Sequence, residues 1–190
     1  MKLLQDRILK EGTVIGTEIL KVDGFMNHQM DPAFLNELAD EFCRLFGDLS
    51  INRILTIESS GIAVAVLTGL KLKVPVVYAK KSQSSNIGED VYSSRIHSFT
   101  RGTDCDITVS KKYLKEGDRV LILDDFLANG EALTGLTDLC RQAGAVVEGI
   151  GICIEKGFQP GGRMIREKGY RVESLAIVEF MGNGCITFRE

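Results

Sequence analysis

The stretch Val120-Leu121-Ile122-Leu123-Asp124-Asp125-Phe126-Leu127-Ala128-Asn129-Gly130-Glu131-Ala132 decides how this sequence folds. Its first residues are continuously apolar and predict a strand buried on both faces at 119–123, and a helix is predicted to follow at 130–143. Two adjacent carboxylates repel each other, so they need a partner such as a divalent cation or sugar hydroxyls. The small residues that open the helix offer free N–H groups and the positive end of the helix dipole to a phosphate monoester. A phosphorylated ribose carries a diol and a phosphate side by side.

Apolar strands alternate with helices on both sides of this stretch. Further strands are predicted at 51–57, 74–79, 104–109, 145–154 and 171–178, and further helices at 62–70 and 160–169. This alternation predicts an α/β fold with a parallel β-sheet flanked by helices on both faces, and ligands bind at the carboxyl ends of such strands. The polar stretch 82–103 is too long for an ordinary turn and is interpreted as a loop that closes over the site as a lid.

The first fifty residues are expected to lie outside the core pattern. A helix is predicted at 2–11, followed by a Val/Ile/Leu-rich stretch at 13–22. Asp31 is placed to cap a second helix with Pro32 at its first position, and Gly47 ends that helix. The chain therefore divides into an N-terminal part, 1–50, and a core, 51–190, within a single compact domain.

Composition and charge exclude several classes of protein. The 190 residues are 44% hydrophobic and 26% charged, which argues against disorder and coiled coil. A net charge of -3 argues against nucleic acid as a partner, and no apolar run is long enough for a membrane helix. The charged start MKLLQDRILKEG has no signal-peptide pattern, and the five scattered cysteines form no Cys-x-x-Cys pair. These features predict a cytoplasmic protein with reduced thiols and no zinc site.

The strand, the two acids and the small-residue loop resemble the signature of the type I phosphoribosyltransferases. The resemblance implies that Asp124 and Asp125 are the catalytic acids and hold the ribose hydroxyls, directly or through Mg²⁺ and its waters. It also implies that the 5′-phosphate of phosphoribosyl pyrophosphate is bound by Ala128, Asn129, Gly130, Glu131 and Ala132. The common family loop has Thr-Gly-Gly-Thr at 129–132, so this chain departs from it, and the Glu131 carboxylate is unfavourable beside a phosphate unless it points outward.

Two further segments suit a pyrophosphate group. A capped turn and an anion-binding nest are both compatible with Glu58, Ser59, Ser60 and Gly61, which lie between a strand and a helix. The resemblance assigns this loop to the pyrophosphate, and family members often have a non-proline cis peptide there. Two lysines at 80–81 end the next strand, either as solvated side chains or as cations that neutralise the leaving pyrophosphate, and Lys81 is the stronger candidate.

The base site is expected from two segments that resemble family members acting on xanthine. These are the hood, defined as residues 20–31, and the strand end at 154–161. The resemblance implies that Leu20 and Asn27 contact the purine and that Lys156 donates to its oxo groups. A lysine only donates hydrogen bonds, so it favours oxo groups and argues against adenine. Xanthine loses a proton readily, so its anion would be attracted to Lys156 and would need no acid at position 128.

The sequence therefore predicts an enzyme of purine salvage that transfers phosphoribose to N9 of xanthine, giving xanthosine 5′-monophosphate and pyrophosphate. By analogy with the family, a homodimer is expected. Two alternatives stay open: an enzyme for guanine or hypoxanthine, and a purine regulator of the same fold that senses phosphoribosyl pyrophosphate. Such regulators carry an N-terminal DNA-binding domain, whereas only about fifty residues precede the first core strand here, and they show no helix-turn-helix signal.

Overall fold

The computed structural model describes residues 1–82, 90–98, 103–182 and 184–189. Its α-helices are α1 (Lys2–Glu11), α2 (Pro32–Phe46), α3 (Gly61–Leu72), α4 (Glu131–Ala143) and α5 (Gly161–Glu167), with a short π-helix η1 (Asp23–Asn27). Its strands are β1 (Thr13–Ile15), β2 (Ile19–Lys21), β3 (Arg53–Ile57), β4 (Val76–Ser82), β5 (Val91–Ser98), β6 (Thr103–Ser110), β7 (Arg119–Leu127), β8 (Val146–Lys156), β9 (Val172–Gly182) and β10 (Cys185–Phe188).

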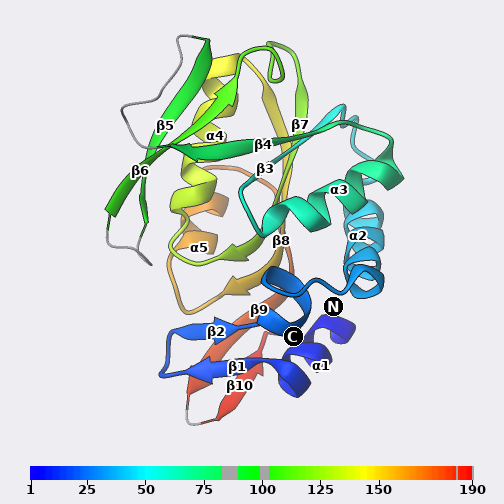
Figure 1. Ribbon diagram of the computed structural model, residues 1–190, viewed down its shortest axis with the longest axis vertical. Coiled ribbons are helices and arrows are strands. Elements are labelled where there is room, and N and C mark those ends of the chain that lie inside the picture. The colour runs from blue at the N-terminus through cyan, green and yellow to red at the C-terminus, as the bar shows by residue number, and fades with distance from the viewer. Residues whose placement is uncertain (83–89, 99–102, 183, 190) are drawn as a thin grey trace.

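The main sheet has eight strands in the order β10-β9-β8-β7-β3-β4-β6-β5 (Figure 1). Its five central strands, β9, β8, β7, β3 and β4, pair in parallel. The strands toward both edges, β10 on one side and β6 and β5 on the other, are antiparallel. The predicted α/β fold is confirmed, and the sheet is mixed rather than wholly parallel because hairpins form its two edges.

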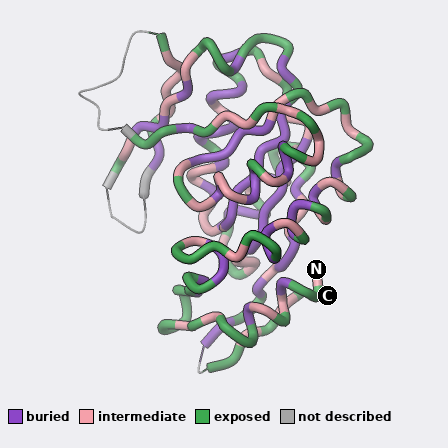
Figure 2. The backbone as a smooth tube through the Cα atoms, turned by 45° about the vertical axis from the view of Figure 1, so that its right-hand side comes forward, coloured by how far each residue is buried: buried purple, intermediate pink, exposed green. Residues whose placement is uncertain are grey.

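Helices bury both faces of the sheet, as the continuous apolar strands predict. Leu121 and Leu123 of β7 belong to a core cluster with side chains of α1, α2 and α3. Val120 and Ile122 belong to a second cluster with side chains of α4 and α5. Successive strand residues point to opposite faces, so β7 contributes to both cores. Figure 2 shows the buried residues gathered along these central strands.

The start of α2 forms as the sequence predicts. The Asp31 side chain accepts a hydrogen bond from the Phe34 N–H at 3.1 Å, Pro32 occupies the first helical turn, and Gly47 follows the last helical residue. The predicted helix at 2–11 is confirmed as α1. The apolar stretch 13–22 folds as a two-stranded hairpin of β1 and β2, which is called the N-terminal hairpin.

The N-terminal part packs closely against the rest of the chain. Strand β1 and helix α1 contact β9, and α2 lies against α3 and β8. The N-terminal hairpin lies beside β9 and β10 at one end of the molecule (Figure 1). One core cluster contains side chains from both 1–50 and 51–190, and the boundary at residue 50 stays a prediction.

The expectation of a loop over the whole of 82–103 is wrong. Residues 91–98 form β5, which pairs with β6 along its full length. Ile96 of β5 packs into a core cluster, and Gln142 of α4 donates to the Ser93 carbonyl at 2.8 Å. Polar residues on the exposed positions hide this edge strand from a hydrophobicity pattern. The parts of the expected lid at 83–89 and 99–102 lie outside the described residues.

The end of β7 and the presence of β10 also differ from the predictions. Strand β7 continues through the two acids to Leu127 instead of ending at Leu123. Strand β10 was not predicted, because four residues at a sheet edge give too short a pattern.

Candidate active site

The site lies where β3 and β7 separate. The two strands pair only as far as Leu55 opposite Ile122. Beyond that point β7 continues beside β8, and β3 continues beside β4. Helix α3 then covers one face of the sheet and α4 the other. A cavity of about 600 Å³ lies at this division, where ligands bind in open α/β sheets.

The cavity brings together most of the predicted site residues. Its lining includes Glu58, Ser60, Lys81, Asp124, Asp125, Ala128, Asn129, Glu131, Ala132 and Lys156. Five predicted residues, Ser59, Gly61, Gly130, Leu20 and Asn27, are not part of this lining. The lining also contains seven residues that the sequence reasoning missed: Glu18, Ile19, Ile57, Ile96, Cys105, Phe126 and Gln159.

Asp124 and Asp125 are buried, at 4% and 8% exposure, and both line the cavity. The Asp125 N–H donates to Asp124 Oδ1 at 3.0 Å. Burial and the neighbouring Asp125 charge raise the pKa of Asp124 well above its usual value. A Cβ atom added to Gly61 would lie 2.8 Å from Asp124 Oδ1, so the start of α3 packs directly on this carboxylate. The acid pair is therefore fixed, desolvated and in need of hydroxyl or cation partners.

The phosphate loop, residues 128–132, is held from behind by α5. Gly130 has a φ of +92°, and α4 begins at the next residue. The Gly161 N–H donates to the Ala128 carbonyl at 3.1 Å. A Cβ atom on Gly161 would lie 2.4 Å from that carbonyl and 2.6 Å from the Gly130 nitrogen, so only glycine permits this approach.

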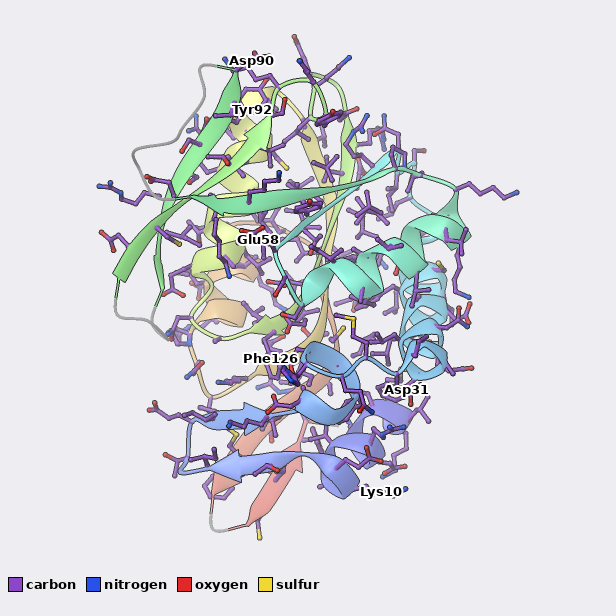
Figure 3. The ribbon with its side chains drawn as sticks, viewed as in Figure 1. Lys10, Asp31, Glu58, Asp90, Tyr92 and Phe126 are labelled. Carbon is purple, nitrogen blue, oxygen red and sulfur yellow. The ribbon has the colours of Figure 1, made fainter. Side chains whose placement is uncertain are left out.

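The 58–61 loop is tied to the end of β4. Glu58 Oε1 accepts from the Lys81 N–H at 2.6 Å, and the Glu58–Ser59 peptide bond is cis, as in the family resemblance. Lys81 lines the cavity, whereas Lys80 lines a separate hollow with Tyr78, because successive strand residues face opposite sides. This placement supports Lys81 as the stronger candidate. Figure 3 labels Glu58 near the middle of the molecule.

Lys156 lies on the other side of the cavity, at the end of β8. Its Nζ donates to the Glu18 carbonyl of the N-terminal hairpin at 2.6 Å. Partial burial lowers the pKa of Lys156, and the nearby Glu18 carboxylate opposes that shift. Leu20 is only 6% exposed and packs in a core cluster, so the neighbouring Ile19 faces the cavity instead. The contact of Leu20 with a base stays a prediction.

Phe126 lines the same cavity as Lys156. The ring packs against the core cluster that contains the hood residues Phe25 and Met26, and Figure 3 shows it next to the hood. Phe126 directly follows the acid pair in the sequence, and this position could have predicted it as a residue of the site. Ile96 could not be found in this way, because it lies on β5, which the sequence did not predict. Cys105 lies on β6, which was predicted as a strand at 104–109, but its pairing with β5 was not predicted.

Comparison with known proteins gives the class. A family model described as "Phosphoribosyl transferase domain" matches residues 32–173. The chain belongs to the phosphoribosyltransferase family. Among its relatives, the xanthine phosphoribosyltransferase of Ruminiclostridium cellulolyticum is 53% identical over 100% of both chains. The enzyme of the same name from Lachnoclostridium phytofermentans is 56% identical over 100% of this chain and 98% of its own.

Solved structures support the fold alone. The adenine phosphoribosyltransferase of Giardia lamblia, complexed with 9-deazaadenine, has a TM-score of 0.76 at 23% identity and covers 92% of this chain and 96% of its own. The adenine phosphoribosyltransferase of Rhodothermus marinus has a TM-score of 0.72 at 19% identity, with coverages of 93% and 98%. Within the described residues, no helix is long and apolar enough to cross a membrane.

Proposed function

We propose that this protein transfers the 5-phosphoribosyl group from phosphoribosyl pyrophosphate to N9 of xanthine, giving xanthosine 5′-monophosphate and pyrophosphate, in purine salvage. One observation carries the proposal: a buried acid pair, a phosphate loop and a lysine that only donates hydrogen bonds line a single cavity. Relatives named xanthine phosphoribosyltransferase, which are 50–56% identical over the full length of this chain, support the choice of base.

The phosphate loop and the acid pair hold the phosphoribosyl group. The first N–H groups of α4 have no acceptor within the helix and point toward the 5′-phosphate, and Gly130 lets the loop approach it closely. Asp124 and Asp125 accept hydrogen bonds from the ribose hydroxyls. As the bond from C1′ to pyrophosphate breaks, positive charge builds on the ribose ring, and the two carboxylates stabilise that charge.

The leaving pyrophosphate lies on the other side of the acid pair. The N–H groups of the 58–61 loop and the Lys81 side chain stabilise its negative charge. Glu58 positions Lys81, because its carboxylate fixes the Lys81 N–H at the end of β4. Ser59 and Gly61 do not line the cavity, so in this proposal they shape the loop that carries Glu58 and Ser60.

Lys156 donates to the oxo groups of the base, with Leu20 and Asn27 of the hood completing the base site. The structure has no carboxylate at Ala128, so proton loss from the base is not assisted there. Xanthine suits this arrangement because it ionises readily and its anion is attracted to the lysine. Phe126 offers the purine ring an apolar surface.

Mg²⁺ enters with the substrate in this proposal. Among the described residues, no group of three or more His, Cys, Asp or Glu side chains is placed to hold a metal ion. Asp124 and Asp125 can supply two carboxylate oxygens to Mg²⁺. The remaining ligands come from the oxygens of phosphoribosyl pyrophosphate and not from the protein. When bound, Mg²⁺ neutralises charge on the leaving pyrophosphate.

The decisive experiment is a base panel. Initial rates are measured with xanthine, guanine, hypoxanthine and adenine, with Mg²⁺ and with EDTA. Xanthine is expected to give the highest kcat/KM, and Mg²⁺ removal to abolish turnover. A preference for adenine would contradict the role of Lys156, and binding of phosphoribosyl pyrophosphate without turnover of any base would favour a regulator.

We also propose an oligomeric state and a cellular location for this protein. A homodimer is expected from the family, and a cytoplasmic location suits the five free cysteine thiols. Size-exclusion chromatography with light scattering tests the oligomeric state.

A further inference from the structure

Gln159 lies in the turn between β8 and α5, which connects Lys156 to Gly161. The Gln159 N–H donates to the Lys156 carbonyl at 2.9 Å, which closes a four-residue turn. Lys156 and Gln159 are both lining residues of the cavity. The turn is fixed on one side by the Gly157 N–H, which donates to Val178 of β9 at 2.8 Å. On the other side, Gly161 is bonded to the phosphate loop.

The Gln159 amide is unusual within this lining. Its Oε1 is buried, yet it has no hydrogen-bond partner among the described residues. A buried acceptor without a donor is unfavourable and calls for an explanation. No other side chain of the cavity lining has such an atom within the described part of the chain. Lys156 differs, because it is already bonded to the Glu18 carbonyl.

We propose that Gln159 determines base specificity by binding the lactam edge of an oxopurine, an N–H group next to a carbonyl. The inference rests on the proposed function and adds a residue to its base site. The amide oxygen accepts from the ring N–H, and the amide NH₂ donates to the adjacent oxo group. Oε1 of Gln159 makes no hydrogen bond in the ligand-free protein. The side chain therefore turns toward the base without breaking a hydrogen bond through this atom. Lys156, three residues earlier, donates to an oxo group from the same turn.

The test replaces the amide with a side chain of the same length and no hydrogen-bonding groups, in Gln159→Met. Removing one hydrogen bond to the base is expected to raise the KM for xanthine about tenfold. The KM for phosphoribosyl pyrophosphate and kcat should stay within about twofold of the wild-type values. The ligand-free variant should be as stable to heat as the wild type or more stable, because an unpaired buried acceptor has been removed.

Phe158→Leu is the matched control, since Phe158 belongs to the same turn, is 41% exposed and does not line the cavity. Its kinetic constants should not change. An unchanged xanthine KM in Gln159→Met overturns the inference. A joint rise of both KM values, or a loss of thermal stability, also overturns it, because either result assigns Gln159 to the scaffold of the phosphate loop.

Failure of the proposed function would give a different experimental result from failure of the role of Gln159. If the wild type uses guanine or hypoxanthine and not xanthine, the choice of xanthine fails, and Gln159 is judged by the KM for the base that is used. If the wild type uses no base, both the proposed function and the role of Gln159 are overturned.

Discussion

Asp124 combines two features that usually destabilise a protein: burial and a neighbouring like charge. Both raise its pKa, and the Lys81 charge offsets this rise only in part. Such an arrangement persists where a ligand needs it. Glu131 also lines the cavity, and it belongs to the loop that we propose for the phosphate.

Asp124→Asn should therefore increase stability while it abolishes most turnover. The folded pKa is above the unfolded value, so the contribution of this group is fully present below the unfolded pKa and is lost as the pH rises through the folded pKa. At neutral pH the ligand-free variant should be more stable than the wild type, because the asparagine amide carries no charge to bury beside Asp125. Urea unfolding between pH 4 and pH 8 measures this, and the gain should shrink toward pH 4. A variant less stable than the wild type at neutral pH would contradict the interpretation.

Glu131→Gln should strengthen substrate binding. The interaction of two partly exposed charges is worth roughly 0.2–1 kcal/mol, so removing the repulsion between Glu131 and the phosphate should lower the KM for phosphoribosyl pyrophosphate by up to about fivefold. The effect should weaken as salt is added. Glu167→Gln, an exposed change on α5, is the control. A higher KM in Glu131→Gln would show that the carboxylate points away and supports the loop in another way.

At the scale of elements, the carboxyl end of β8 and helix α5 act as one unit. Glu155 is 2% exposed and accepts from Arg166 of α5 at 2.8 and 2.7 Å and from the Ser174 hydroxyl at 2.5 Å. Burial alone would raise the pKa of Glu155, but these hydrogen bonds lower it below its usual value. The ion pair thus anchors α5, whose first residue supports the phosphate loop.

Glu155→Gln should weaken the fold in a pH-dependent way. The folded pKa is depressed, so the stabilisation is present above the unfolded value near 4.5 and is lost as the pH falls through the folded pKa. Arg166 is partly exposed, so we expect a loss of only about 2 kcal/mol at pH 7, and a smaller difference below pH 4. Unfolding curves at several pH values test this. The surface variant Glu179→Gln should lose little, and an equal loss in both variants would contradict the argument.

The sequence predicts elements best where local signals and burial agree. Helix α2 has a capping aspartate, a proline in its first turn and one apolar stripe, and it forms as expected. Strand β5 fails the same test, because a half-covered edge strand with polar residues has no continuous apolar pattern. The extension of β7 through Asp124 and Asp125 was missed because pairing with β8, a tertiary contact, keeps charged residues in the strand.

At the scale of the whole molecule, the site depends on contacts between distant parts of the chain. Lys156 and Glu18 are 138 residues apart, yet they are joined by a hydrogen bond and both line the cavity. The sequence predicted Lys156 and the acid pair from local patterns and a family resemblance. It could not predict that Ile19, rather than Leu20, lines the cavity, because that depends on how the N-terminal hairpin packs on β9.

Lys156→Met should separate two roles of the lysine, which are the proposed hydrogen bond to the base and the hydrogen bond to the N-terminal hairpin. Loss of a charge-assisted hydrogen bond should raise the KM for xanthine roughly 10- to 100-fold. Without ligand, the amides of residues 13–21 should exchange hydrogen faster, because the N-terminal hairpin has lost its bond to β8. Hydrogen exchange with mass spectrometry measures this, with helix α2 as the internal reference. Unchanged exchange in the hairpin would show that the bond to Glu18 does not hold it.

The contact between Gly161 and the phosphate loop has a consequence for substrate size. Lys156, Gln159 and Gly161 belong to one short stretch of backbone, so peptide geometry sets the spacing between the place for the base and the place for the phosphate. The backbone part of this spacer has a fixed length, and only the Lys156 and Gln159 side chains can adjust to a ligand of another length. Nucleotides with an extra methylene group between sugar and phosphate should therefore be rejected even when both of their ends are correct.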